Sequence, residues 1–347
     1  MDETMRVMTE TPRNAETPRR SLQSWITANA VFFDRNQAEI PKSPVDLDTW
    51  RLAIDGKVNT AIELDFNTLL DMPKAIAANT MECSGNSRSL LQQKASGNPW
   101  TIGGVGNGVW GGVWLRDVLN KAGITASARH VAFEGFDKPL GKAQIQFIRS
   151  IPLEKAMSST LLAYEMNGEP LPLKHGFPLR GLALGWTGAN CVKWLRRITL
   201  LEHPYEGFFM DKVYRVFAKD QAPETGEVVT GLKCKSIITQ PERDAVFLPG
   251  EVTILGAAYA GEQDVVTVEV SLDDGATWQP AELFGPHEPY AWRQWQFVHS
   301  FDNPGTYTVL SRATDSSGRI QPMQADWNKL GYGNNGVREH SISFRIE

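Results

Sequence analysis

Cysteine is scarce in this chain of 347 residues, which contains only Cys83, Cys191 and Cys234. These cysteines are odd in number, lie far apart and form no C-x-x-C pair. The pattern argues against a disulfide framework, a zinc knuckle and covalently attached haem. We therefore expect reduced thiols and no haem.

Long apolar runs and basic stripes are also missing. No stretch approaches the roughly 18 consecutive apolar residues of a membrane-spanning helix, so no membrane span is expected. The net charge is -5 without a basic cluster, which argues against nucleic acid as a partner. Residues 1–20 are polar and lack the apolar segment of a secretory signal. The default prediction is a cytoplasmic protein, with the periplasm as the alternative if an export signal was removed.

Two common cofactor motifs are absent as well. The six histidines form no H-x-H or H-E-x-x-H arrangement, which argues against an independent zinc site. Residues 103–108 resemble a dinucleotide loop, but the final glycine is misplaced and no strand with a correctly spaced acidic residue accompanies them. NAD binding is therefore excluded.

The length of the chain and its change of pattern predict two domains. We expect a flexible N-terminus over 1–20, a first domain over 21–215, a linker over 216–234 and a second domain over 235–347. The linker is polar and contains Pro223 and Gly226.

The first domain has an α+β pattern. Short apolar strands, helical patches and glycine-rich connections alternate from residue 50 to about 201. Residues 113–123 show apolar positions at helical spacing with Gly123 at the expected C-cap, so they predict a short helix packed on a sheet. Residues 153–166 predict a second helix or a strand pair.

The second domain has the alternation of half-buried strands. Residues 265–271 predict a strand, 273–275 a tight turn, and the chain returns through Trp278. The alternation repeats at 292–301 and 307–313. Several short strands in this span predict an all-β immunoglobulin-like sandwich.

The turn at residues 81–88, M-E-C-S-G-N-S-R, contains the most informative cysteine. Arg88 and the backbone N–H groups of a Ser-Gly-Asn turn favour the thiolate of Cys83, the form that attacks a substrate or binds a soft metal. Cys83 is therefore a candidate nucleophile or metal ligand. The alternative is a small buried hydrophobe at a strand end.

Three further segments share a set of cations, amides and glycines with this turn: 32–37, 175–180 and 188–194. Arginine and lysine beside glycine are suited to binding a phosphate or another oxyanion. The segments together predict a phosphorylated cofactor, although each cation alone could be a surface ion-pair residue.

In this order, the four segments resemble the molybdenum domain of the sulfite oxidase family, and the second half resembles the dimerisation domain of that family. The resemblance extends over residues 21–347 and includes further matching blocks at 100–104, 133–137, 163–168 and 268–278. It implies a molybdopterin-binding catalytic domain over 21–215 and a homodimer formed through the Ig-like domain.

The resemblance also implies a cofactor, molybdenum with one molybdopterin, and its ligands. By the family pattern, the sulfur of Cys83 binds the metal. The residues expected to bind the cofactor are Arg35, Asn36, Gln37, Cys83, Asp137, His175, Arg180, Cys191, Val192 and Lys193.

The residues implied at the substrate are Arg88 and Tyr214 near the metal, Trp100 as a wall of the pocket, and Arg35, which serves cofactor and substrate together. They predict a small anionic substrate.

Three positions depart from the family pattern. Gln37 stands where sulfite oxidisers commonly have histidine, and Ser87 where many members have arginine. Leu330 stands where animal enzymes have arginine, with Lys329 and Arg338 as candidate substitutes for that charge.

The predicted function is the oxidation of sulfite, or of a similar small oxyanion or sulfur compound, by oxo transfer, with electrons passed to a separate cytochrome-type acceptor. One alternative is a reductase of the same fold acting on nitrate or a sulfoxide. Another is a non-catalytic assembly protein with a vestigial pocket.

Overall fold

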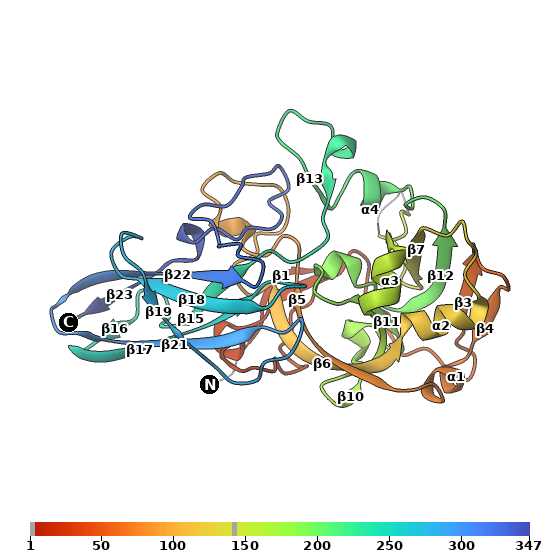
Figure 1. Cartoon of the computed structure of the whole chain (residues 1–347), viewed down its shortest axis with the longest axis horizontal. Helices are drawn as coiled ribbons and strands as arrows, with labels where there is room; N and C mark the ends of the chain where they lie inside the picture. Colours follow the sequence, from red (N-terminus) through yellow and green to blue (C-terminus); the bar gives the residue numbers. More distant parts are fainter. Residues whose placement is uncertain (1–3, 141–143) are drawn as a thin grey trace.

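The chain forms two bodies that lie side by side along the long axis of the molecule (Figure 1). The structure is a computed structural model and describes residues 4–140 and 144–347. The first body combines an antiparallel sheet and a mixed sheet with short helices, and the second is a β-sandwich. The predicted α+β domain followed by an all-β Ig-like domain is confirmed.

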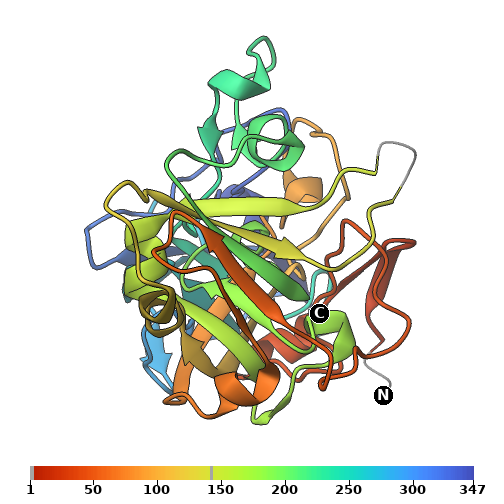
Figure 2. The same ribbon diagram turned by 90° about the vertical axis from the view of Figure 1, so that its right-hand side faces the viewer.

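The first body contains two five-stranded sheets. One sheet has the order β10-β9-β6-β5 with β11 paired to β9, and its strands are β5 (Ala75–Glu82), β6 (Val105–Trp114), β9 (Thr160–Met166), β10 (Glu169–Pro170) and β11 (Arg180–Ala183). The other has the order β4-β3-β12-β7-β8, with β3 (Leu52–Gly56), β4 (Ile62–Leu64), β7 (His130–Gly135), β8 (Ile148–Pro152) and β12 (Leu195–Leu201). Figure 2 looks at this end of the molecule.

The helices of the first body are short and cover the sheets: α1 (Phe66–Leu70), α2 (Leu115–Ala122), α3 (Leu153–Ser159) and α4 (Phe208–Asp211). The predicted helix over 113–123 is confirmed as α2, except that its first two residues end β6. Helix α2 buries Leu115, Val118 and Leu119, and it ends at Gly123, whose φ of 70° suits glycine. The segment 153–166 forms α3 followed by β9.

The second body consists of a four-stranded and a five-stranded sheet. The first has the order β15-β17-β21-β20, with β15 (Lys235–Gln240), β17 (Gly250–Tyr259), β20 (Glu282–Phe284) and β21 (Arg293–Phe301). The second has the order β16-β23-β22-β18-β19, with β16 (Val246–Phe247), β18 (Val265–Ser271), β19 (Gln279–Pro280), β22 (Gly305–Asp315) and β23 (Ile342–Ile346). Trp295 and Phe344 lie in the core of the sandwich.

The N-terminal segment packs on the first body instead of extending freely. Strands β1 (Arg6–Glu10) and β2 (Arg13–Glu16) form a hairpin, and Asn14, Ala15 and Glu16 are buried. This arrangement differs from the flexible N-terminus predicted over 1–20, of which residues 1–3 lie outside the described part. The reason is that the polar side chains of β2 bond to buried polar groups of the first body, a role that composition does not reveal.

The segment between the bodies contains a small two-stranded sheet of β13 (Arg215–Val216) and β14 (Glu227–Val228), which projects at the top of Figure 1. The domain and linker boundaries given above stay a prediction. In the part of the chain that the structure describes, no helix combines the length and hydropathy that a bilayer-spanning helix needs.

Candidate active site

Two cavities meet at the end of β5. The first encloses about 740 Å³ and the second about 670 Å³, each counted with its open mouth. Both are lined by Arg35, Gln37, Cys83 and Tyr214. Cys83 therefore stands at the junction of the two cavities.

The loop that carries Cys83 is fixed by its own backbone and by Asn86. The N–H of Cys83 donates to the carbonyl of Gly104 at 2.8 Å, and the N–H of Asn86 donates to the carbonyl of Cys83 at 2.8 Å. The Asn86 side chain donates to the Glu82 carboxylate at 3.0 Å and accepts from the Gly104 N–H at 2.9 Å. Cys83 is 7% exposed, packs in a cluster of buried apolar side chains and lines both cavities. Its sulfur can therefore meet a group bound in either cavity, and its role as a metal ligand stays a prediction.

The first cavity gathers buried cations. Lys193 donates to the Asn36 carboxamide and, at 2.9 Å, to the carbonyl of Lys174. Arg180 donates to the carbonyl of His175 at 2.9 Å and to that of Cys191 at 3.2 Å. These partners are neutral, so the positive charges of Lys193 and Arg180 have no directly bonded anion within the described residues.

The pKa shifts show how strongly this cavity disfavours positive charge. Burial and the neighbouring Arg180 lower the pKa of Lys193 to about 7, and burial lowers that of Arg180 to about 10. Burial, together with Lys174 and Lys193, holds the pKa of His175 well below its ordinary value, so its imidazole is neutral. A bound anion would restore the favourable charged state of these groups.

Arg35 has the opposite behaviour because it faces potential anions. Burial opposes its charge, but the hydroxyl oxygen of Tyr214 and the sulfur of Cys83 outweigh burial and raise the pKa of Arg35 above its ordinary value. Its guanidinium is held by the Asn14 side chain at 3.2 Å and lies 3.5 Å from the Tyr214 hydroxyl. Arg35 therefore links the two cavities electrostatically.

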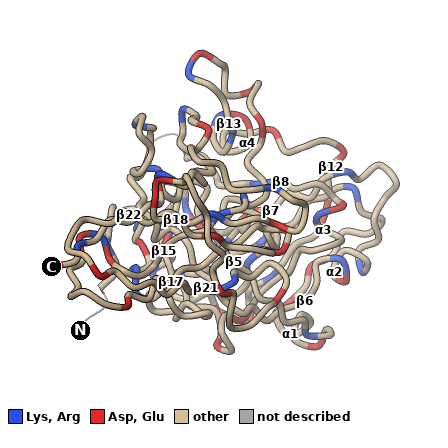
Figure 3. Tube along the Cα trace, turned by 60° about the vertical axis from the view of Figure 1, so that its left-hand side comes forward, with Lys and Arg blue, Asp and Glu red and all other residues tan. Residues whose placement is uncertain are grey.

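The donor set of the first cavity fits a phosphorylated, sulfur-bound cofactor. The Nε of Arg180 is buried without a hydrogen-bond partner in the described part of the chain, and it belongs to a cavity with excess cationic groups. Lys and Arg residues are interspersed with Asp and Glu residues along the Cα trace (Figure 3). The attraction for an anion must therefore come from the cations of the cavity itself.

The structure brings the predicted cofactor residues together. Every residue predicted to bind the cofactor lines the first cavity: Arg35, Asn36, Gln37, Cys83, Asp137, His175, Arg180, Cys191, Val192 and Lys193. Their roles toward a cofactor stay predictions. The sequence analysis did not assign Met81 and Phe147 to the site, although both line this cavity, because a single apolar residue carries no signal of a site.

In the second cavity, Arg88 lies in a slot formed by glycines. Its Nε donates to the carbonyl of Leu330 and its Nη1 to that of Asn98, each at 2.8 Å. A Cβ placed on Gly85 would lie 2.2 Å from Nη2 of Arg88, and one on Gly97 would lie 2.7 Å from Nη1. The guanidinium is therefore held in one position by backbone groups and close glycines.

Tyr214 faces the same cavity in an unusual backbone conformation with a φ of 57°. Its hydroxyl oxygen accepts a hydrogen bond from Gln37 at 2.7 Å, which leaves the hydroxyl proton free to point at a bound molecule. One face of its ring stacks on Tyr332 with a centroid distance of 5.5 Å. Trp100, predicted as a wall, is 1% exposed and lines this cavity.

Arg149 lies against the Tyr214 ring and was missed by the sequence analysis. Its guanidinium carbon is 5.3 Å from the ring centroid, and its Nη2 donates to the side chain of Asn190 at 3.0 Å. Burial lowers the pKa of Arg149 to about 10. No motif marks this arginine, because its position under Tyr214 arises only when β8 packs beside the segment 208–214.

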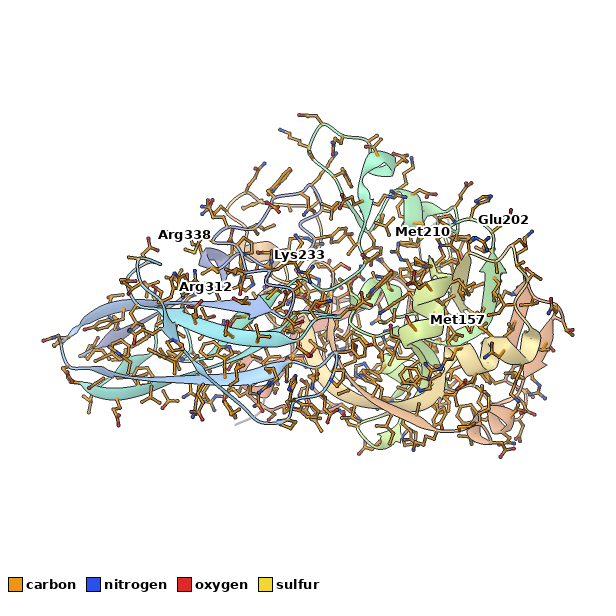
Figure 4. The ribbon with its side chains drawn as sticks, viewed as in Figure 1. Met157, Glu202, Met210, Lys233, Arg312 and Arg338 are labelled. Carbon is orange, nitrogen blue, oxygen red and sulfur yellow. The ribbon has the colours of Figure 1, made fainter. Side chains whose placement is uncertain are left out.

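The three departures from the family pattern have different environments. Gln37 and Leu330 line the second cavity. Ser87 is fully buried and bonds to Lys235 and His340. The prediction that Lys329 or Arg338 replaces the missing charge is wrong, because neither is among the described residues that line the cavity. Lys329 is exposed. Arg338 lies on the second body and pairs with Asp274 at 2.6 Å (Figure 4).

Comparison with known proteins identifies the family. The family model "Oxidoreductase molybdopterin binding domain" matches residues 37–209, and "Mo-co oxidoreductase dimerisation domain" matches residues 227–343. The chain belongs to the sulfite oxidase family. The resemblance of its sequence motifs to this family is thereby confirmed.

Proteins similar to this chain come from animals and plants. Rat mitochondrial sulfite oxidase is 37% identical, over 94% of this chain and 63% of the relative. Arabidopsis thaliana sulfite oxidase is 32% identical, over 99% of this chain and 94% of the relative. Phaseolus vulgaris nitrate reductase [NADH] 2 is 32% identical, over 93% of this chain and 40% of the relative. The chain thus spans about 63% of the length of the mammalian enzymes.

Among solved structures, the sulfane dehydrogenase SoxCD from Paracoccus pantotrophus has the same fold. The TM-score is 0.84 at 26% identity, over 98% of this chain and 88% of that chain. The similarity therefore includes both bodies of this sulfite oxidase family member.

Proposed function

We propose that this protein is a molybdenum-dependent oxidoreductase that oxidises sulfite, or a similar small sulfur compound, and passes electrons to a separate cytochrome-type acceptor. The observation that carries the proposal is the position of Cys83 between a cavity with excess buried cations and a cavity that contains Arg88 and Tyr214. Relatives named sulfite oxidase and a structural neighbour named sulfane dehydrogenase support a sulfur substrate.

The residues of the first cavity would hold one molybdopterin. Arg180 and Lys193 would bind its phosphate because they are buried cations with neutral partners. Cys83 would bind the metal through its sulfur. When bound, the cofactor supplies the two-electron redox chemistry of molybdenum at the junction of the cavities.

The residues of the second cavity would bind and orient the substrate. Arg35 and Arg88 present guanidinium groups to an oxyanion, and the fixed position of Arg88 lowers the entropy lost on binding. The Tyr214 hydroxyl oxygen accepts a hydrogen bond from Gln37, so its proton is free to be donated to the bound molecule. Trp100 and Tyr332 exclude bulk water from one side of the site.

A reductase of nitrate is the second candidate, because a plant nitrate reductase matches at 32% identity over 93% of this chain. The reductase and the oxidase differ in the direction of electron flow. Assays with sulfite plus an oxidised cytochrome, and with nitrate or a sulfoxide plus a reduced dye, distinguish them. We expect turnover of sulfite and negligible turnover of nitrate.

Metal analysis combined with Cys83→Ser tests the site itself. We expect one molybdenum per chain in the wild type. We expect turnover to fall by more than about 100-fold in the variant, because the loss of a residue that only hydrogen-bonds to a metal ligand already lowers activity or metal affinity by 10–100-fold. Wild-type rates in Cys83→Ser would overturn the assignment. Purified wild type without molybdenum would favour the non-catalytic assembly protein.

A further inference from the structure

A buried polar network joins the Cys83 loop to the second body. The carboxylate of Glu82, the residue before Cys83, accepts hydrogen bonds from Lys235 at 2.8 Å and from the Tyr259 hydroxyl at 2.8 Å. Lys235 is the first residue of β15 and is 1% exposed, and Tyr259 is the last residue of β17. The end of β5 is thus held by two strands of the sandwich.

The same network reaches the other side of the loop through Ser87. The hydroxyl oxygen of Ser87 accepts from Lys235 at 3.1 Å and lies 2.8 Å from Nε2 of His340. Nδ1 of His340 lies 2.6 Å from the carbonyl of Gly336. Because a carbonyl only accepts, Nδ1 carries a proton. Burial holds the pKa of His340 well below its ordinary value, so the ring is neutral and Nε2 accepts from the Ser87 hydroxyl.

The backbone of the loop is constrained at the same point. Ser87 has a φ of 64°, in the left-handed region. The side chain of Asn334, from the second body, donates to the Ser87 carbonyl at 2.8 Å. Arg88 follows directly, so the second body controls the backbone from which the Arg88 side chain starts.

Stability alone does not require such a network. Replacing a buried ion pair by well-packed apolar side chains is often neutral or stabilising. The chain has a second buried lysine between the bodies, Lys155, which bonds to Glu262 at 2.7 Å and to the carbonyl of Leu184. That pair joins the bodies without contacting residues 82–88, so it provides a natural comparison.

We propose that Lys235 and His340 are positioning residues of the active site, which act through Glu82 and Ser87 to set the places of the Cys83 sulfur and the Arg88 guanidinium. The second body is then part of the catalytic apparatus in addition to any role in dimer formation. This inference rests on the proposed function, because it assigns Cys83 to the metal and Arg88 to the substrate.

The test is the double variant Lys235→Met with Glu82→Gln in the full-length, metal-loaded protein. It removes both buried charges together and avoids the uncompensated charge that a single substitution leaves. We expect molybdenum content and the thermal midpoint to stay near wild type, kcat to fall by about tenfold or more, and the sulfur-to-metal charge-transfer absorption to shift. An unchanged kcat and absorption band would overturn the proposal.

A gentler variant keeps the test informative if the double variant does not fold. Ser87→Gly removes the hydroxyl and suits the φ of 64° at this position. It leaves the Lys235–Glu82 pair in place. A smaller shift of the same absorption band, with a fall in kcat, supports the proposal, and a wild-type band and kcat refute it.

The matched control is Lys155→Met with Glu262→Gln, which removes an ion pair that joins the bodies away from residues 82–88. We expect its absorption band and kcat to equal those of wild type. A shift of the absorption band as large as that of the Lys235→Met, Glu82→Gln variant would refute a specific positioning role. If wild type itself lacks molybdenum and turnover, the proposed function fails. If wild type is active and the Lys235 and Ser87 variants match it, only this inference fails.

Discussion

Arg88 is held almost entirely by backbone carbonyls and by the closeness of glycines, so its guanidinium remains available to a substrate. We expect Arg88→Met to lower kcat/KM for sulfite by roughly 10- to 100-fold, which corresponds to about 1–3 kcal/mol for a lost charged hydrogen bond. Most of the loss should occur in KM. Steady-state assays at saturating acceptor measure it.

Gly85→Ala provides a companion variant that retains the arginine. The added Cβ would lie 2.2 Å from Nη2 of Arg88, so the guanidinium has to move. We expect a similar rise in KM for sulfite. If both Arg88→Met and Gly85→Ala keep the wild-type KM, Arg88 does not bind the substrate.

Lys193 predicts a pH dependence of the apoprotein. Burial and Arg180 lower its pKa to about 7 in the folded chain, whereas an unfolded lysine has a pKa of about 10.4. Between these values the unfolded chain binds more protons, so the free energy of unfolding rises with pH, by up to about 1.4 kcal/mol per pH unit from this residue. Below pH 7 the penalty is complete and constant.

Chemical denaturation of metal-free protein at several pH values measures this slope. The comparison is with Lys193→Met, which lacks the titrating group. We expect the difference in unfolding free energy between the two proteins to change with pH above 7, and cofactor loading to abolish the change because a bound phosphate restores the charged lysine. A difference independent of pH in the apoproteins would contradict the prediction.

At the scale of elements, the β1–β2 hairpin supports the active site. The side-chain oxygen of Asn14 accepts from Arg35 at 3.2 Å and from the N–H of Asn36 at 3.0 Å. Glu16 accepts from the hydroxyl of Thr101 at 2.9 Å, next to the Trp100 wall. The hairpin therefore fixes residues of both cavities.

Asn14→Ala tests this support. It leaves the donors of Arg35 and Asn36 without their acceptor, at a cost of about 1–3 kcal/mol, so we expect weaker retention of molybdenum on dialysis and a lower kcat/KM for sulfite. The control is Glu10→Ala on the same hairpin, whose carboxylate pairs with Arg13 at the surface. If Asn14→Ala and Glu10→Ala retain molybdenum equally and have the same kcat/KM, the hairpin does not support the site.

At the scale of the whole molecule, the second body contacts the site and carries the features of a dimerisation domain. It contributes Leu330 and Tyr332 to the lining of the second cavity. It also matches the dimerisation domain of the family and exposes apolar side chains on its strands, including Val266 and Val298, which are 48% and 50% exposed. We therefore propose that the protein is a homodimer.

Light scattering coupled to size-exclusion chromatography measures the assembly. We expect a mass of twice the 38.6 kDa of one chain, independent of loading concentration in the micromolar range. A mass of 38.6 kDa at these concentrations would contradict the dimer.

Much of the architecture could be predicted from local pattern. The structure has strands and a helix where the sequence predicts them, at residues 265–271, 293–301 and 115–122. The spacing of apolar residues predicts them because it follows the face on which each element is buried. The cysteine turn with its glycine and arginine could also be recognised, since residues close in sequence form it. The same holds for the cationic segments that line the first cavity.

The sequence by itself therefore determined the two-domain architecture, the family and the chemical character of the cofactor cavity. Only the tertiary structure decided how the site is held. Arg35 donates a hydrogen bond to Asn14, Arg149 lies over the ring of Tyr214, and Lys235 donates to Glu82. These contacts join residues more than twenty positions apart, and in two cases more than sixty. Local sequence patterns do not predict these contacts. Whether a polar group is buried depends on which distant segment packs over it, and this is decided only when the whole chain folds.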